Sequence, residues 1–468
     1  MAATSFAVGT GGLVTPSVQK MTTQASYLDI RNNGWAQQYL PELYNAEVEK
    51  YGDRSISGFI QMLGAEMPMA SDQVIWSEQG RLHIAYQATC ATGSGNLSNI
   101  KNIDDVSGSN VAHGLRVGNT VVCSIQNVVF KGYVKSAGAT PQIVPYNAAT
   151  PGDISGITDD SNQTIKLFVY GSEFGKGANP MDESIEPKFL SLSNSPIIIK
   201  DHFEINGSDA GQIGWIEVSG ESGQGGYLWY LKSQGDTSKR YEDYLEMVMV
   251  EAEKSAASAD AAVPVGTEGL FSAIGSRGMV ATGFFDDAAD PVLASFDTLL
   301  NNLDEQGAIE ENMLFLDRGA NLGIDDMLGA VNANFDGGTS FGVFNNSEDM
   351  ALNLGFSGFR RGSYDFYKTD WKYLNDKSTR GLVGGLEGVL VPAGTSSVYD
   401  QNLGKNIKRP FLHVRYRASE ADDRRLKTWI TGSLGGASSS GVDKMEVHYL
   451  SERCLVVQAA NNFIRFDS

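Results

Sequence analysis

The sequence contains few cysteines and no residue pattern typical of a metal site. Its three cysteines, Cys90, Cys123 and Cys454, lie far apart and form no Cys-x-x-Cys pair, so neither a disulfide framework nor a zinc site is expected. The five histidines show no His-x-His or His-x-x-x-His spacing. We therefore expect no metal, no other cofactor and a reducing compartment such as the cytoplasm.

Positive charge is also scarce. The chain has 36 Lys and Arg against 56 Asp and Glu, which gives a net charge of −20 and a pI of about 4.7. Sequence-independent binding to nucleic acid depends on Lys and Arg that displace counterions from phosphates. The balance of charge therefore argues against a protein that binds nucleic acid, and an acidic surface would repel DNA.

Long hydrophobic runs are absent. No window approaches the roughly 20 apolar residues that a membrane span needs. Residues 1–21 contain one lysine and lack the apolar segment, at least about seven residues long, of a secretory signal. We expect neither a membrane anchor nor a signal peptide.

The composition is that of a globular protein with many turns. At 468 residues the chain exceeds the usual size of one hydrophobic core, so two or three lobes are expected. Apolar residues make up 41% and charged residues 20%, which is enough apolar sequence for a core in each lobe. The 53 glycines exceed average usage and predict tight turns. Residues 1–34, rich in Thr, Ser, Gly and Ala, are typical of an arm that a neighbour must cover.

Hydrophobic periodicity predicts both helices and strands, and thus an α+β fold. A helix of about three turns is expected within residues 35–50, and a longer one after the cluster at 235–238, with Asp236 or a neighbouring hydroxyl as its cap. Asp290 and Pro291 should open a further helix that stops at Gly307. No repeat of 20 to 50 residues is apparent, which argues against solenoids and propellers.

Strands are predicted by alternation of apolar and polar residues. Residues 73–86 alternate around Gly80 and predict a strand pair or a long ribbon. Short valine-rich strands in a β-rich insertion are expected at about 90–160, followed by strands at 164–170 and 196–205, the second of them buried. The remaining expected strands are 313–316, 388–392, 411–416 and 445–450, with a hairpin that pairs 455–458 with 463–466.

Motifs that resemble catalytic loops fail on their context. Residues 338–342 match the pattern of a serine nucleophile elbow, but no helix is predicted after the serine, so a hairpin turn is the better interpretation. Residues 171–177 resemble a phosphate-binding loop, yet one residue is missing between the glycines and no Ser or Thr follows Lys176. Adjacent acids such as Asp104 and Asp105 lack the spacing of a calcium loop. No enzymatic activity is predicted.

One basic cluster stands out from the acidic background. Its members are Lys405, Lys408, Arg409, Arg415, Arg417, Arg424, Arg425 and Lys427, offset by Glu420, Asp422 and Asp423. The cluster could contact an acidic face of another subunit, or it could be a solvated surface of mixed charge. Contact with DNA is the least favoured alternative, because of the net charge.

Three segments carry a resemblance to a known family. They are residues 44–86, residues 195–210 with 212–215, and residues 307–316. The chain resembles the major capsid proteins of tailed double-stranded DNA phages, and most closely those of crAss-like phages. The likeness extends from about residue 35 to the end and is weak between 90 and 160.

The resemblance implies a phage capsid, or Johnson, fold. Its expected parts are an N-terminal arm (1–34), a helix and lead-in (35–72), an extended loop (73–197) that carries the insertion, a peripheral domain with a long spine helix (198–262), an axial domain (263–385) and C-terminal strands that return to the peripheral domain (386–468). No crosslinking Lys and Asn pair can be matched, so no isopeptide chemistry is expected.

The resemblance further implies a structural role in a virion assembled in the cytoplasm of a bacterial host. Copies would associate as hexamers and pentamers around double-stranded DNA bound without sequence specificity, and with no membrane. Further partners would be a portal and scaffold or decoration proteins. Trp76 and Arg81 are candidate interface anchors together with Arg409, Arg424 and Arg425. Trp76 could instead pack within its own lobe. The alternatives for the whole chain are an encapsulin-type compartment shell and a β-rich, glycan-binding phage tail protein.

Overall fold

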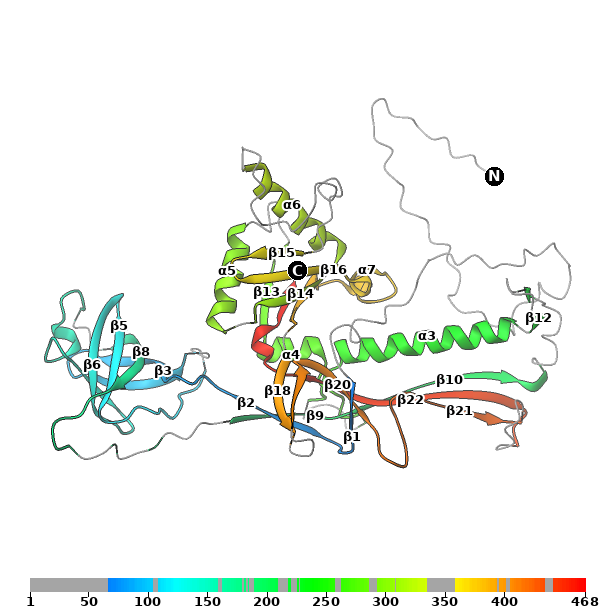
Figure 1. Cartoon of the computed structure of the whole chain (residues 1–468), viewed down its shortest axis with the longest axis horizontal. Coiled ribbons are helices and arrows are strands. Elements are labelled where there is room, and N and C mark those ends of the chain that lie inside the picture. The colour runs from blue at the N-terminus through cyan, green and yellow to red at the C-terminus, as the bar shows by residue number, and fades with distance from the viewer. Residues whose placement is uncertain are drawn as a thin grey trace, which may run out of the picture. The chain divides into compact units, whose positions relative to one another are not determined.

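The computed structural model describes residues 66–103, 108–158, 162–178, 181, 184, 189–208, 218–219, 225–226, 228–256, 262–285, 293–307, 309–334, 358–393, 395–400, 405–433 and 441–468. These residues form a strand-rich α+β fold, which confirms the predicted class (Figure 1). The predicted arm, the predicted helix within 35–50 and residues 338–342 lie outside the described residues. None of the helices in the described ranges is long and apolar enough to cross a bilayer.

The chain divides into two compact units. The first comprises Met1–Arg54 and Gln212–Leu231, and the second comprises Ser55–Gly211 and Lys232–Ser468. The described part of the first unit contains the short antiparallel pair β11 (Val218–Ser219) and β12 (Gly225–Gly226) and the beginning of α3. The elements below belong to the second unit.

Six strands close into a barrel with a hydrophobic core of its own. The strands are β3 (Ala85–Ala91), β4 (Asn96–Asn102), β5 (Asn119–Ile125), β6 (Val128–Ser136), β7 (Gln142–Pro145) and β8 (Gln163–Ser172). They pair in the order β3-β4-β7-β6-β5-β8, and a 3-10 turn, η3 (Pro151–Asp153), lies between β7 and β8. The β-rich insertion is thereby confirmed, and β8 is the predicted strand 164–170 with longer ends.

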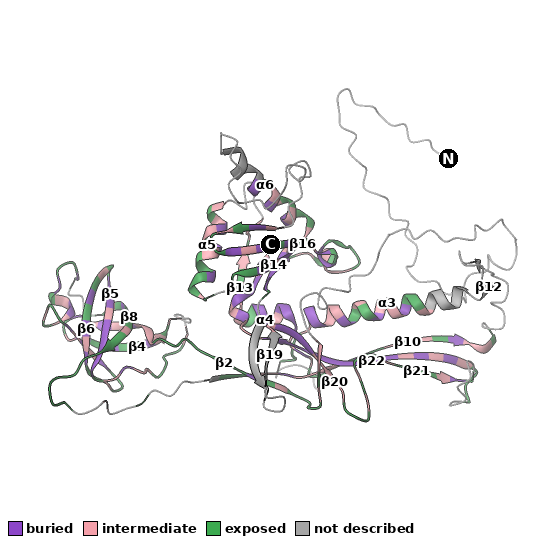
Figure 2. Cartoon of the chain, in the orientation of Figure 1, coloured by how far each residue is buried: buried purple, intermediate pink, exposed green. Residues whose placement is uncertain are grey.

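Alternation of side chains between the inside and the outside of the barrel follows from the period of two in a strand. Along β8, Ile165 and Leu167 are buried while Lys166 and Phe168 are exposed, and Figure 2 shows the same alternation on β5 and β6. The two-residue connection between β5 and β6, Gln126 and Asn127, has φ values of 49° and 65°. Positive φ at both central residues suits the right-handed twist of a tight hairpin.

The barrel core also contains two cysteines. Cys90 and Cys123 are both fully buried and unpaired. Burial raises the pKa of the Cys90 thiol to about 11, because a thiolate loses its hydration in an apolar interior. Both groups therefore act as small apolar side chains at neutral pH.

A two-stranded ribbon flanks the barrel in sequence. Strand β2 (Val74–Gln79) pairs antiparallel with β9 (Phe189–Asn194), with Trp76 opposite Leu192. Of the two alternatives predicted for residues 73–86, a strand pair within this segment is wrong, because β2 pairs with β9 while β3 enters the barrel. The chain leaves the ribbon through β2 and returns through β9, so the barrel is an insertion between these two strands.

A five-stranded sheet lies against the long helix α3 (Leu228–Glu251) (Figure 1). Its strands are β1 (Glu66–Met69), β10 (Ile197–Asn206), β20 (Leu412–Arg417), β21 (Lys427–Gly432) and β22 (Lys444–Val457). Tyr241 on α3 is buried, donates a hydrogen bond from its hydroxyl to the carbonyl oxygen of Ile199 at 3.0 Å and packs on the Tyr449 ring at 5.5 Å. A further pair, β18 (Thr395–Asp400) and β19 (Lys405–Pro410), precedes β20.

Two predictions about these elements need correction. Helix α3 begins at Leu228, so Gly235 and Asp236 lie inside the helix and Asp236 does not cap it. Strand β10 is not buried throughout, because it alternates: Ile199 is buried and Ile198 is half exposed. Only one face of β10 packs against α3, and this arrangement could not be read from three consecutive isoleucines.

A six-stranded sheet forms the second large layer. Its order is β13 (Met279–Thr282), β23 (Ile464–Asp467), β17 (Gly388–Pro392), β14 (Glu311–Leu316), β16 (Tyr364–Asp370) and β15 (Gly358–Arg361). The helices in this part of the sequence are α4 (Leu270–Arg277), α5 (Leu293–Glu305), α6 (Arg318–Asn334), α7 (Lys372–Asn375) and α8 (Arg380–Val383). Phe296 of α5 packs on Phe359 and Phe366 of the sheet, with ring centroids 5.5 and 5.1 Å away.

Sequence reasoning predicted some of this layer correctly. Helix α5 and its end are confirmed, with Gly307 in the left-handed conformation at φ 66°. Helix α6 was not predicted, although Ala320, Ile324 and Leu328 have helical spacing and are buried. The predicted hairpin of 455–458 with 463–466 is wrong. A 3-10 turn, η6 (Ala460–Asn462), redirects the chain so that β22 and β23 join different sheets.

The fully buried side chain of Asn194, at the end of the ribbon, links three segments. Its Nδ2 donates to the carbonyl oxygens of Leu455, at 2.7 Å, and Glu268, at 3.0 Å. Its Oδ1 accepts hydrogen bonds from the Ser195 and Glu268 amides and from the Thr267 hydroxyl. One amide side chain thus joins β9, strand β22 and the segment that leads into α4.

Replacement of this amide should destabilise the fold. Asn194→Ala leaves several buried donors and acceptors without partners, and we expect a loss of about 1–3 kcal/mol in the free energy of unfolding. Chemical denaturation of purified protein measures it. Asn96→Ala, at an exposed position of β4, is the matched control. A loss no larger at Asn194 than at Asn96 would contradict the linking role.

Candidate functional site

Among the described residues, no group of three or more His, Cys, Asp or Glu side chains could hold a metal ion. The serine-elbow pattern at 338–342 lies outside the described residues. In the loop-like segment 171–177, Gly171 and Ser172 complete β8, and an exposed turn with Gly177 at φ 78° follows. The candidate site therefore consists of the residues that the sequence predicts to act in assembly.

Trp76 lies on β2 and faces its own chain. It is 8% exposed, and its indole N–H donates to Glu78 Oε1 at 3.0 Å. The same carboxylate oxygen accepts the backbone N–H of Ala459, also at 3.0 Å. Trp76 and Glu78 thus attach the ribbon to Ala459, in the turn that follows β22. This favours the alternative in which Trp76 packs in its own lobe, and a role as interface anchor stays a prediction.

Arg81 follows β2 and is exposed. Its Nη2 donates to the carbonyl oxygen of Glu305, the last residue of α5, at 2.6 Å. The last carbonyls of a helix have no partner within it and carry partial negative charge, so a guanidinium is a suitable cap. The adjacent Leu82 is highly exposed. The structure therefore places Arg81 in a contact within the chain and leaves Leu82 uncovered.

The centre of the basic cluster is an acid that sequence reasoning missed. Glu452 lies on β22 with its side chain 5% exposed. Its carboxylate accepts hydrogen bonds from Arg417 Nη1 at 2.9 Å and Arg424 Nη1 at 2.8 Å. Arg417 also pairs with Asp72, and Arg424 pairs with Asp422 at 3.2 Å. The glutamate compensates two guanidinium groups that converge from separate segments.

A second acid, Glu66 on β1, forms ion pairs on the other side of the cluster. Arg425 pairs with Glu66 Oε2, and the Arg425 guanidinium lies 5.8 Å from the centre of the Tyr416 ring. The buried Arg453 lies 3.5 Å from Glu66 Oε1. Desolvation lowers the pKa of Arg453, and the charge of Glu66 opposes that shift. Charge pairing therefore fastens β1 to β22 and to the segment before β21.

The basic cluster is thus partly a structural network. Arg424 and Arg425 direct their guanidinium groups at carboxylates of the same chain, while Arg409 lies on β19 opposite Ser396 and its side chain is outside the described set. Their proposed contact with another subunit stays a prediction. Glu452 and Glu66 carried no sequence signal, because an isolated acid in a strand gives no sign of which cations will surround it.

Neutralisation of Glu452 should weaken this network. Glu452→Gln preserves the shape but leaves two guanidinium groups facing an uncharged amide, and we expect a loss of about 1–3 kcal/mol in the free energy of unfolding. Denaturant unfolding gives the value, with Glu420→Gln on an exposed neighbouring loop as control. Equal stabilities for the two variants would rule out the network as a stabilising feature.

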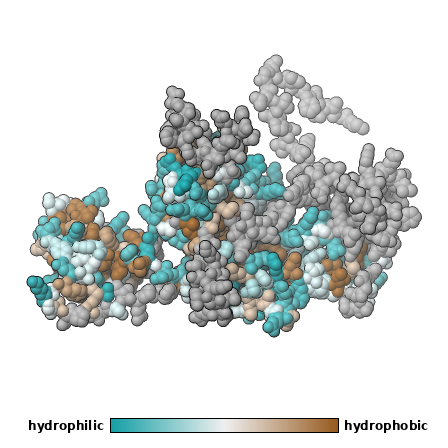
Figure 3. Space-filling view, in the orientation of Figure 1, coloured by the Kyte–Doolittle hydropathy of each residue, from teal (hydrophilic) through white to brown (hydrophobic). Residues whose placement is uncertain are grey.

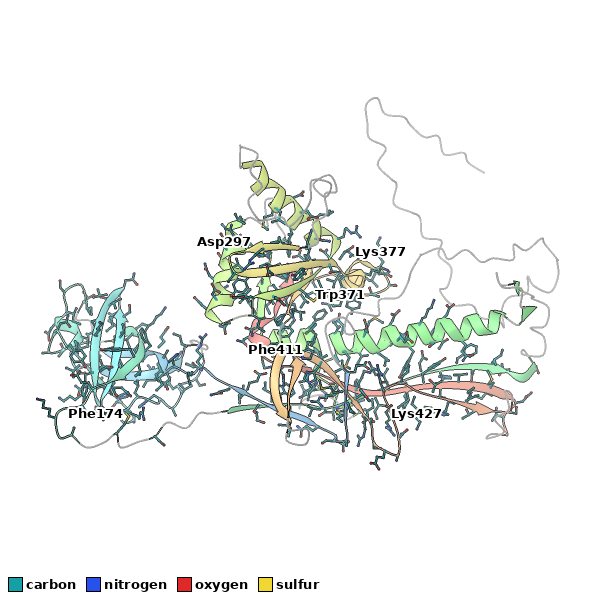
Figure 4. All side chains as sticks on the ribbon, viewed as in Figure 1. Phe174, Asp297, Trp371, Lys377, Phe411 and Lys427 are labelled. Carbon is teal, nitrogen blue, oxygen red and sulfur yellow. The ribbon has the colours of Figure 1, made fainter. Side chains whose placement is uncertain are left out.

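The ion pairs also predict a pH dependence. Hydrogen bonds from Lys427, at 2.7 Å, and Arg424 lower the pKa of Asp422 below its ordinary value of 3.8 (Lys427 is labelled in Figure 4). Because the folded-state pKa is lowered, this stabilisation is complete above pH 3.8 and is lost as the pH falls through the folded-state value. As the pH is lowered below 3.8, the thermal midpoint should fall less steeply for Asp422→Asn than for wild type. The exposed Asp326→Asn should retain the wild-type slope, and identical slopes for all three proteins would refute the assignment.

Comparison with known proteins gives one kind of match. No protein-family model matches the chain, and no curated protein matches it. Solved phage structures do match. One from Gordonia phage Cozz has 11% identity, covers 97% of this chain and 98% of that chain, and has a TM-score of 0.39. The capsid of cyanophage P-SCSP1u has 7% identity, covers 75% of this chain and 84% of that chain, and has a TM-score of 0.34. The procapsid of satellite phage P4 has 11% identity, covers 86% of this chain and 84% of that chain, and has a TM-score of 0.31.

Proposed function

We propose that this chain is the major capsid protein of a tailed phage, a structural subunit with the Johnson fold. Copies associate as hexamers and pentamers into an icosahedral head that encloses double-stranded DNA. The sequence resemblance given above supports this proposal, and the crAss-like phages are its narrower form. The protein works by contacts between subunits and has no catalytic step.

The observation that carries the proposal is the ribbon of β2 and β9. It has only two strands, and such a pair is marginally stable in water unless something packs on it. Trp76 covers one face from within the chain, but Ile75 is 63% exposed and Leu190 is 60% exposed. A ribbon with uncovered large apolar side chains offers a surface that a neighbouring subunit could cover.

The order of elements supports the same proposal. The ribbon and barrel correspond to the extended loop, α3 with its five-stranded sheet to the peripheral domain, and the six-stranded sheet with α5 and α6 to the axial domain. Of the C-terminal strands, β20, β21 and β22 join the sheet against α3, whereas β17 and β23 join the six-stranded sheet. The chain therefore crosses between the two layers after residue 386.

Assembly by many modest contacts fits this architecture. Once one contact holds two subunits, each further contact forms within the same assembly and benefits from a high effective concentration. Closed point-group symmetry then repeats every contact around the shell. The net charge of −20 suits a container for DNA, because it keeps free subunits from collecting on the genome.

The ribbon offers a direct test. Ile75→Asp places a charge on an exposed position, so the single chain should keep its thermal midpoint while shell formation by the purified protein falls strongly. Burial of one such side chain is worth about 1.5–3 kcal/mol at each repeated contact. Sedimentation and negative-stain imaging measure the assembled fraction, with Ile75→Val as the conservative control.

The outcomes separate the candidate functions. Closed shells, or pentamers and hexamers, support a shell subunit, and in virions DNA and a portal rather than a protein cargo distinguish a phage head from an encapsulin-type compartment. A stable trimer that binds glycans would favour the tail protein. A lone monomer under all assembly conditions, with no counterpart in purified virions, would refute the proposal.

A further inference from the structure

The strands of the barrel differ in charge from the chain as a whole. Its six strands, all of which the structure describes, contain four lysines, Lys101, Lys131, Lys135 and Lys166, and no Asp or Glu. The whole chain has 56 acidic and 36 basic residues. The walls of the barrel are therefore basic, and the rest of the protein is correspondingly more acidic.

One side of the barrel combines these lysines with exposed apolar groups. We define the barrel wall as the outward residues of β6, β5 and β8, namely Val122, Val129, Lys131, Lys166, Phe168 and Tyr170. Strand pairing places Val122 between Lys131 and Phe168. The next row places Ser124 between Val129 and Lys166. The lysines and apolar side chains are thus interleaved on one continuous surface.

The apolar members of the barrel wall are well exposed. Val129 is 67% exposed, Phe168 is 48% exposed and Tyr170 is 51% exposed. Figure 3 shows hydrophobic residues at the surface of the barrel between hydrophilic ones. None of these side chains contributes to the barrel core, which is made of the inward residues of the same strands. Nothing in the fold of the barrel requires large apolar residues at these positions.

A neighbouring tyrosine side chain is already ordered. The Tyr146 hydroxyl donates to Glu173 Oε2 at 2.6 Å, and this hydrogen bond is the main reason that the pKa of Tyr146 rises to about 12. The backbone N–H of Tyr146 donates to the carbonyl oxygen of Lys131 at 3.0 Å, which places Tyr146 beside the barrel wall. Rigid, amphipathic tyrosines lose little entropy on binding and are enriched in protein interfaces.

We propose that the barrel wall docks against an acidic surface of a second copy of this chain. The proposal rests on the proposed function and names a partner surface for the insertion. Charge complementarity favours this occupant, because the wall carries lysines and a second copy has a net charge of −20. The exposed valines and aromatic rings supply the apolar contact that a protein surface, but not a phosphate backbone, can cover.

Nucleic acid fits the wall less well. Binding of single strands depends on aromatic platforms in a groove lined with cations, whereas aliphatic Val122 and Val129 occupy the middle of this wall. The cations are also few, and the chain as a whole repels a polyanion. Contact with DNA is therefore the alternative that the test has to detect.

Charge reversal tests the contact in the full-length protein. The double variant Lys131→Glu with Lys166→Glu should raise the concentration needed for shell assembly about tenfold or more, because like charges then face each other across the contact. The substituted side chains are outward, so the far-UV circular dichroism spectrum and thermal midpoint should match wild type. Lys239→Glu with Lys377→Glu changes the net charge equally at exposed positions on other elements and should assemble nearly as wild type does (Lys377 is labelled in Figure 4).

Photo-crosslinking identifies what touches the wall. A photoreactive phenylalanine derivative replaces Val129, and particles are assembled from a mixture of light and heavy isotope-labelled subunits. Crosslinks between light and heavy peptides that fall on acid-rich segments support the proposal. Crosslinks to nucleic acid alone, crosslinks only within one copy, or none at all would overturn it, as would equal assembly defects in the two charge variants.

Failure of the inference and failure of the proposed function give different results. If wild-type protein forms no assembly under any condition, the shell role itself is refuted. If wild-type shells form and the Lys131→Glu and Lys166→Glu variant assembles at the same concentration, the shell role stands and only the docking contact is refuted.

Discussion

The buried side chain of Asn194 is the interaction on which the arrangement of the second unit depends. A primary amide has two donors and an acceptor with two lone pairs, and each of these finds a backbone or hydroxyl partner here. The partners belong to β9, β22 and the segment before α4, which are distant in sequence. A buried polar network of this kind specifies one arrangement, because any shift of a segment leaves desolvated groups without hydrogen bonds.

Charge pairing fastens strands close to this network, since Glu452 and Leu455 lie on the same stretch of β22. Glu452 and Glu66 lie between arginines of β20, of the segment before β21 and of β22. Without those cations the two carboxylates would be uncompensated charges in a partly buried place, and the cations would in turn repel one another without the acids. The cations of the cluster between residues 417 and 427 are therefore paired with acids in the folded chain. Its interface role depends on what surface remains around Arg424 and Arg425 once these pairs have formed.

The distribution of charge separates the barrel from the rest of the chain. An acidic protein is soluble and avoids the genome, but copies with the same charge also repel one another. A basic, apolar wall on an inserted domain would counter that repulsion at a defined contact. The ribbon adds uncovered apolar surface at Ile75 and Leu190 next to the insertion in sequence. Uncovered surface and local charge, rather than reactive groups, are the features that a shell subunit needs.

The sequence by itself determined those features that depend on near neighbours along the chain. Period-two alternation predicted β8 and the strands of the barrel, and Gly307 marked the end of α5 correctly. Composition and motif spacing argued against catalysis and predicted an acidic α+β protein. Helix α6 shows the limit of such reasoning, because its buried residues have helical spacing but glycines at 319 and 323 obscure it.

Only the tertiary structure decided which segments become partners. Pairing of β2 with β9 across the whole barrel, the entry of β22 and β23 into different sheets, and the burial of Trp76 follow from contacts between distant residues. The same holds for the candidate site: Arg81, Arg424 and Arg425 could be chosen as cations, but the carbonyl of Glu305 and the carboxylates of Glu452 and Glu66 reach them only in the folded chain. The physical reason is that local periodicity sets which face of an element is apolar, whereas the identity of its partner depends on packing and charge pairing summed over the whole fold.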